Sequence, residues 1–84
     1  MRLAQRSAFR RRVKKLTPSE RQAVAAALQR FAADPFDATL RTHKLSGELA
    51  GKWAFSAGYD LRVVFTLEGD LATLLAVGSH DEVH

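Results

Sequence analysis

The sequence contains no cysteine, which excludes disulfide bonds, thiolate metal sites and cysteine nucleophiles. No apolar run approaches the ~20 residues that a helix needs to cross a bilayer, and no apolar segment follows the basic start as in a secretory signal. Internal repeats, low-complexity segments and linkers are also missing. These absences predict a single cytoplasmic domain, residues 1–84, that does not enter a membrane.

Acidic residues are missing from the first 15 positions, whereas the other 69 positions hold six bases and all nine acids. The bases of the first 15 positions are Arg2, Arg6, Arg10, Arg11, Arg12, Lys14 and Lys15. This asymmetry favours contact with an anionic polymer or an acidic protein. A solvated helix face would have the same composition, so charge alone leaves both interpretations open.

The first third of the chain predicts a helical hairpin. Two runs of apolar residues have the spacing of one helical face: Phe9, Val13 and Leu16, then Val24, Leu28 and Phe31. Between them, Thr17 can cap a helix that has Pro18 in its first turn and Glu20 as the capping-box acid. The second helix should end before Pro35, which disfavours helical geometry at the residue it follows.

The rest of the chain predicts strands. Segments 52–57, 60–67 and 71–78 are short, rich in β-branched and aromatic residues, and bounded by Gly or Asp. Residues 68–70 (Glu-Gly-Asp) predict a three-residue hairpin loop. In the resulting register, Leu61, Val63, Phe65 and Leu67 lie opposite Val77, Leu75, Thr73 and Leu71, and this face should receive the helices.

On the other face of this hairpin, the same register places Arg62 opposite Ala76 and Asp60 opposite Gly78. His80 follows two residues after Gly78. An aspartate, an arginine and a histidine should therefore meet at one end of one face. The expectation depends on the register, because a slip of one residue would send every side chain to the opposite face.

The closing residues "HDEVH" place His80 and His84 four positions apart, which superficially resembles the zinc motif H-E-x-x-H. Here the second position is Asp81, the motif stops at the last residue, and no third ligand stands out. We therefore expect neither a metal nor another cofactor.

Metal-free phosphoryl transfer on RNA fits the same residues better. RNA carries its own nucleophile, the 2′-OH, so a protein need only align the attack, stabilise the extra charge and protonate the leaving 5′-oxygen. Histidine suits the proton transfer and arginine suits the phosphate charge. His80 and Arg62 supply these two groups, and His43 and Lys44 lie near enough in sequence to join them.

Each of these residues also has a purely structural interpretation. His80 would begin a short C-terminal turn, Arg62 would pair with Asp60, and His43 would be an ordinary loop residue. Trp53 and Tyr59 would pack at the sheet margin, although either ring can stack on a base.

The order of motifs resembles toxins of the RelE/ParE superfamily. The resemblance rests on "DPF" after the helical hairpin, "HKLSGELAGKW" before a strand, "DLRVVF" as a central strand, and "AVGSHDEV" near the end. It is nearest to the YafQ-like and RelE-like messenger RNA interferases of type II toxin–antitoxin systems. It implies an α+β fold in which an N-terminal strand, residues 2–5, and the helical hairpin pack on one face of an antiparallel β-sheet.

The resemblance also implies site residues. His80 matches the C-terminal proton-transfer histidine, and His43 matches the histidine before the Leu–Gly stretch. Asp60 matches the acid at the head of the third strand, and Arg62 the phosphate-facing arginine. RNA-backbone contacts are expected from Lys44, Lys52, Arg10, Arg11 and Lys14. Two positions depart from the pattern: a histidine of the second strand corresponds to Ser56 or a neighbour, and His84 stands where relatives carry an aromatic residue.

The resemblance implies a ribosome-dependent endoribonuclease that cleaves messenger RNA in the ribosomal A site, leaves a 2′,3′-cyclic phosphate and inhibits translation. Its partners would be messenger RNA, the ribosome and a cognate antitoxin, in a toxin–antitoxin hetero-oligomer. Two alternatives share the fold: a ParE-like inhibitor of DNA gyrase, and a catalytically degenerate member that only binds its antitoxin. The general base stays open among His43, Asp60 and Lys44.

Overall fold

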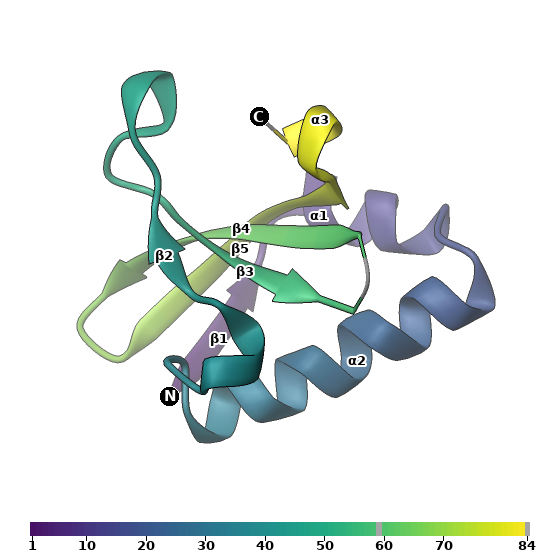
Figure 1. Cartoon of the computed structure of the whole chain (residues 1–84), viewed down its shortest axis with the longest axis horizontal. Helices are drawn as coiled ribbons and strands as arrows, with labels where there is room; N and C mark the ends of the chain where they lie inside the picture. The colour runs from purple at the N-terminus through teal and green to yellow at the C-terminus, as the bar shows by residue number, and fades with distance from the viewer. Residues whose placement is uncertain (59, 84) are drawn as a thin grey trace.

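The structure is a computed structural model that describes residues 1–58 and 60–83. Its elements are β1 (Arg2–Gln5), α1 (Ser7–Lys14), α2 (Pro18–Ala33), the 3₁₀ turn η1 (Ala38–Leu40), β2 (His43–Lys44), the 3₁₀ turn η2 (Gly47–Leu49), β3 (Trp53–Ala57), β4 (Leu61–Glu68), β5 (Leu71–Ser79) and α3 (His80–Val83). Figure 1 shows α2 on one side of the sheet, and α3 with the segment around η2 on the other. In the described part of the chain, no helix is long and apolar enough to cross a membrane.

The helical hairpin predicted from the sequence is confirmed. Thr17 Oγ1 accepts from the backbone N–H of Glu20 at 3.2 Å, and Glu20 Oε1 accepts from the N–H of Thr17 at 2.9 Å. These two bonds form the capping box that starts α2, with Pro18 in the first turn. The helix ends at Asp34, whose extended backbone precedes Pro35.

The sheet has the strand order β1-β5-β4-β3-β2. β1 runs parallel to β5, and the other neighbours are antiparallel. The α+β class and the leading strand are therefore confirmed, and the parallel β1 makes the sheet mixed rather than wholly antiparallel. The two-residue strand β2, which forms one edge of the sheet, was not predicted.

The predicted register of the last hairpin is wrong in two ways. Glu68 pairs with Leu71, so the loop has two residues, Gly69 and Asp70, and not three. Further along, Phe65 pairs with Leu74 while Val64 pairs with Ala76, so Leu75 is an extra residue in β5, a β-bulge. The shorter loop turns the first part of β5 over, and the bulge turns the rest back.

These shifts change the side chains that β5 presents to the helices. The face of β4 is as predicted, with Leu61, Val63 and Phe65 buried beneath the helices. The partners from β5 are Ala72, Leu74 and Val77, and of these only Val77 was predicted. At the centre of this core, the ring centroid of Phe31 lies 4.6 Å from that of Phe55 and 4.8 Å from that of Phe65.

The face of the sheet opposite α1 and α2, called here the second face, holds a smaller apolar cluster. Its buried members are Leu45, Ala54 and Val64, with Leu49, Leu75, Ala76 and Val83 packed around them. Leu49 belongs to η2 and Val83 to α3, so this cluster anchors both segments on the second face (Figure 1). The candidate catalytic residues are positioned on this same face.

Candidate active site

Arg62 lies at the centre of the second face. It follows β4 two residues before Val64 and so points to the same side, and it pairs with Ser56 on β3 and Gly78 on β5. Arg62 is half-buried, and its neighbour Gly78 has no side chain to cover it. The predicted partner, Ala76, is wrong because of the shorter loop and the bulge. A guanidinium on this floor presents a planar fork of N–H donors that suits a phosphate.

His43 lies on the same face, at the sheet edge. It pairs with Ala54, and directly opposite residues share a face of the sheet. Its Nδ1 atom lies 2.8 Å from the carbonyl oxygen of Arg41. Since a carbonyl oxygen can only accept, Nδ1 carries the proton of this bond, and in the neutral ring Nε2 is left with a lone pair. This is the tautomer that a general base using Nε2 requires.

The backbone before His43 fixes this geometry. Arg41 has a left-handed conformation with φ of 53°, the only positive φ of a non-glycine residue among those described. The Thr42 hydroxyl donates to the carbonyl of Pro35, which ties the segment to the end of α2. Sequence reasoning missed Arg41, because nothing in the pattern around an arginine indicates a left-handed residue.

His80 begins α3, directly after β5. Its side chain is exposed, and it lies two residues beyond Gly78, the partner of Arg62. Val83 packs into the apolar cluster of the second face and so holds α3 over it. The strand order places His43 on one side of Arg62, two strands or about 10 Å away, and His80 on the other. Two histidines therefore flank one arginine.

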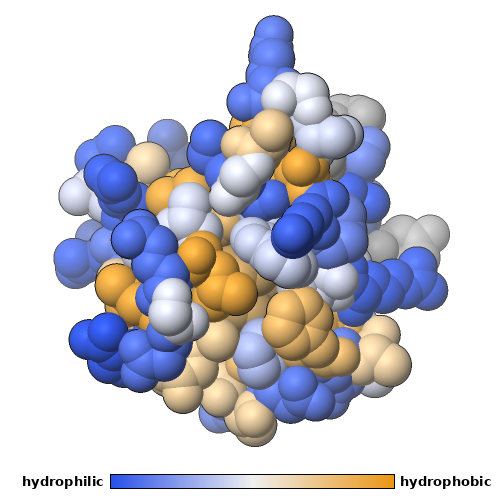
Figure 2. Space-filling model, turned by 90° about the vertical axis from the view of Figure 1, so that its left-hand side faces the viewer, coloured by the Kyte–Doolittle hydropathy of each residue, from blue (hydrophilic) through white to orange (hydrophobic). Residues whose placement is uncertain are grey.

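Lys44 points the other way. It pairs with Trp53, which packs against the helical core, and its Nζ lies 5.3 Å from the centroid of the Trp53 ring. Lys44 and Lys52 line a hollow of about 310 Å³ together with Gly51 and Trp53. This hollow lies on the side of β2, which Figure 2 faces, and there hydrophobic surface lies among hydrophilic surface. Lys44 thus lies on the opposite face from His43, although the two residues are adjacent.

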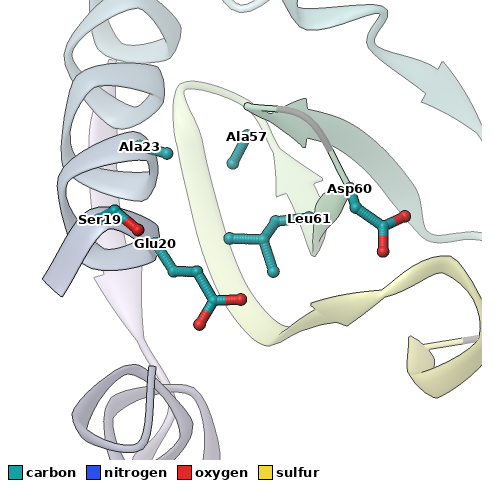
Figure 3. Close-up of a pocket in the computed structure, with 6 residues that line it drawn as sticks. All are labelled: Ser19, Glu20, Ala23, Ala57, Asp60 and Leu61. Atoms are coloured by element: carbon teal, nitrogen blue, oxygen red, sulfur yellow. The ribbon is translucent and has the colours of Figure 1, made fainter. Parts of the chain in front are cut away.

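Asp60 lies outside the strand, just before β4, and does not pair with Gly78 as predicted. It lines a separate hollow of about 270 Å³ with Ser19, Glu20, Ala23, Ala57 and Leu61. In Figure 3 its carboxylate points away from Ser19 and α2. The expected meeting of Asp60 with Arg62 therefore has no support from strand pairing.

The basic residues of α1 lie far along the sheet from β2. Phe9 anchors this helix in the core, and Arg10, Arg11 and Lys14 are exposed. Among residues 1–58 and 60–83, no three His, Asp or Glu side chains gather as metal ligands. Stacking by Tyr59 and the departure at His84 concern positions outside the described residues.

The chain matches no protein-family model and no curated protein. Solved structures do match. The crystal structure of YafQ from E. coli strain BL21(DE3) has a TM-score of 0.82 at 15% identity, covering 99% of this chain and 98% of that one. A metal-bound toxin from Helicobacter pylori has a TM-score of 0.78 at 19% identity, covering 100% and 99%. The heterotetrameric YoeB–YefM toxin–antitoxin complex from Staphylococcus aureus has a TM-score of 0.75 at 12% identity, covering 95% and 97%.

These likenesses concern the fold. The chain has a RelE/YoeB-like toxin fold, so the resemblance found in the sequence is confirmed at the level of architecture.

Proposed function

We propose that this protein is an endoribonuclease toxin of a type II toxin–antitoxin system that cleaves messenger RNA in the ribosomal A site without a metal ion. One observation carries the proposal. Arg62 lies on the second face between His43 and His80, and the Nδ1–H of His43 is engaged by a carbonyl, which leaves Nε2 as a base. The RelE/YoeB-like toxin fold adds support.

The reaction follows from these three groups. Nε2 of His43 takes the proton of the 2′-OH, and the resulting oxygen attacks the adjacent phosphorus. Arg62 stabilises the additional negative charge on the pentavalent phosphorus. The bond to the 5′-oxygen then breaks, and His80 gives that oxygen its proton. The products are a 2′,3′-cyclic phosphate and a 5′-OH.

His43 is better supported as the general base than the two other candidates. Lys44 lies with Trp53 on the opposite face from Arg62. Asp60 precedes β4 and lines a hollow against α2, outside the pairing that aligns Arg62 with Gly78. We assign Asp60 the secondary role of orienting the RNA at the end of the sheet.

The exposed bases of α1 are proposed to hold ribosomal or messenger RNA through phosphate contacts. These are Arg10, Arg11 and Lys14. Such contacts weaken as salt rises, because binding releases condensed counterions. A cognate antitoxin is the proposed cytoplasmic partner, since a structural neighbour was solved in a heterotetrameric toxin–antitoxin complex.

The test is cleavage in a purified translation reaction, with new 5′ ends mapped by primer extension. Wild type and His80→Ala are compared with and without ribosomes, and Arg30→Gln serves as a control because Arg30 is exposed on α2. We expect new ends at A-site codons with wild type and the control, and only when ribosomes are present. Cleavage without ribosomes would discard the A-site mechanism. An uncut messenger under every condition would favour the gyrase-inhibiting or antitoxin-binding alternatives.

A further inference from the structure

Phe36 is unusually exposed for a large apolar side chain. It follows Pro35 in the turn after α2 and is 56% exposed, more than Met1 at 41% or Leu3 at 37%. Exposing such a ring forgoes about 1.5–3 kcal/mol of burial. A large exposed aromatic side chain at a fixed position suits the binding of a flat ligand.

Neighbouring rings hold Phe36 in place. Its ring centroid lies 5.6 Å from that of Trp53, at an angle of 72° between the planes. Trp53 in turn stacks on Phe65 of the core, with centroids 6.4 Å apart. The backbone of the Phe36 segment is fixed as well, because Asp34 Oδ1 accepts from the N–H of Phe36 at 3.0 Å. Phe36 is therefore a rigid platform and not a loose surface side chain.

Two ammonium groups accompany this platform. Lys44 and Lys52 line the hollow of about 310 Å³ that Trp53 also lines, and Lys44 Nζ lies over the Trp53 ring. The backbone of Lys52 is held at both ends, since its carbonyl accepts from Leu45 at 2.9 Å and its N–H donates to Leu49 at 3.0 Å. Gly51 closes the hollow with φ of 90°, which L side chains rarely adopt.

We propose that this hollow and Phe36 form a second RNA-binding subsite, which takes one nucleotide of single-stranded RNA. The base stacks on Phe36, and Lys44 and Lys52 bind the adjacent phosphates. The subsite lies outside the second face and adds to the contacts of the proposed catalytic residues.

The edge position of β2 connects the two sites. β2 is the last strand of the sheet, and its two residues point to opposite faces: His43 to the second face, Lys44 to the hollow. An RNA strand bound at His43 reaches Lys44 by passing over this edge. This continuity favours RNA over an acidic peptide as the occupant. The argument rests on the proposed function for the path of the RNA, and the test below measures binding separately.

Trp53 provides a direct readout, because it is the only tryptophan in the chain. Its fluorescence is titrated with a 2′-deoxy oligonucleotide of about ten nucleotides, a length within known site sizes, which the proposed reaction cannot cleave. We expect a saturable change in emission with wild type. Phe36→Ala should weaken binding by about 5- to 150-fold, the equivalent of one lost stacked base. Lys44→Gln and Lys52→Gln should each lower the salt dependence by about 0.7 in log–log slope.

Matched variants separate stacking from general stickiness. Phe36→Tyr keeps a flat ring and should bind like wild type, whereas Phe36→Leu keeps an apolar side chain without the plane and should bind weakly. Leu3→Ala removes another exposed apolar side chain at the far edge of the sheet and should change nothing. Circular dichroism and thermal melting confirm that each variant is folded.

Several results would overturn this subsite. One is an emission that does not respond to the oligonucleotide, and another is equal binding by Phe36→Ala and wild type. A response to poly-glutamate of the same length but not to the oligonucleotide would identify a protein-docking surface instead. His80→Ala should keep the fluorescence response. A protein that binds the oligonucleotide through Phe36 but never cleaves messenger would contradict the proposed function and leave this subsite standing.

Discussion

The Nδ1 atom of His43 lies 2.8 Å from the carbonyl oxygen of Arg41, two residues earlier in the chain. This bond selects the ring nitrogen that carries the proton, and it is made possible by the left-handed backbone of Arg41. The side chain next to it in sequence, Lys44, points to the other face. A two-residue strand thus separates a candidate base from a candidate phosphate contact.

The first prediction concerns His43 itself. His43→Ala removes the proposed base and should lower the rate of messenger cleavage by about 10²- to 10⁴-fold. His43 is exposed, so the variant should fold normally. Single-turnover cleavage on programmed ribosomes measures the rate, and Lys44→Ala is the control. If Lys44→Ala lost the larger part of the rate, the assignment of the base would be wrong.

The second prediction concerns Arg41 as a positioning residue. Arg41→Asn tolerates the left-handed backbone and should keep the cleavage rate and its pH profile. Arg41→Val resists that backbone, so it should cost about 1–2 kcal/mol and misplace the carbonyl that bonds His43. We expect the acidic limb of the pH–rate profile to shift for the valine variant only. Matching profiles for both variants would show that Arg41 does not act through His43.

Much of the fold was predictable because some side chains act on their own backbone. Thr17, Pro18 and Glu20 form a local capping box whose residues can be recognised in any context. The hairpin loop was different. Gly69, with φ of 61°, fits a loop of two or three residues, and only the pairing of whole strands decides between them. The bulge at Leu75 has no local signal either, since both of its neighbours are apolar.

The candidate site was predictable in part for the same reason. Arg62 was placed on the correct face because the face of β4 does not depend on the loop. The position of Asp60 depended on the register and was wrong. Lys44 was grouped with His43 because no strand was expected there. Once β2 is known, alternation along the strand separates the two.

The third prediction concerns the close approach of Gly58 to α2. Gly58 has φ of 76°, and a Cβ there would lie 3.0 Å from the Cβ of Ala23. Gly58→Ala therefore combines backbone strain with a clash and should destabilise the protein by about 1–3 kcal/mol. Urea unfolding measures the change. Adding Ala23→Gly removes the clash but not the strain, so the double variant should recover only part of the loss beyond the cost of Ala23→Gly alone.

The fourth prediction concerns acid stability. Bonds from the Thr39 hydroxyl at 2.6 Å and from the Thr39 N–H at 2.8 Å lower the pKa of Asp37. A carboxyl with a lowered pKa in the folded state stabilises the fold above its unfolded pKa of about 3.9, and this contribution is lost as the pH falls through the folded pKa. Asp37→Asn should make the decline of stability below about pH 4 shallower. Urea midpoints across this range, which would be equally steep for both proteins if the bonds were unimportant, provide the check.

The central claim is that the second face cleaves RNA through the 2′-OH of its own substrate. The most direct measurement uses a messenger with a single 2′-deoxy nucleotide on the 5′ side of the scissile bond, placed in the ribosomal A site. The account predicts that the all-ribose messenger is cut and ends in a 2′,3′-cyclic phosphate, while the deoxy messenger stays intact at that position. Equal cutting of the deoxy messenger would contradict it, because another nucleophile would then be at work.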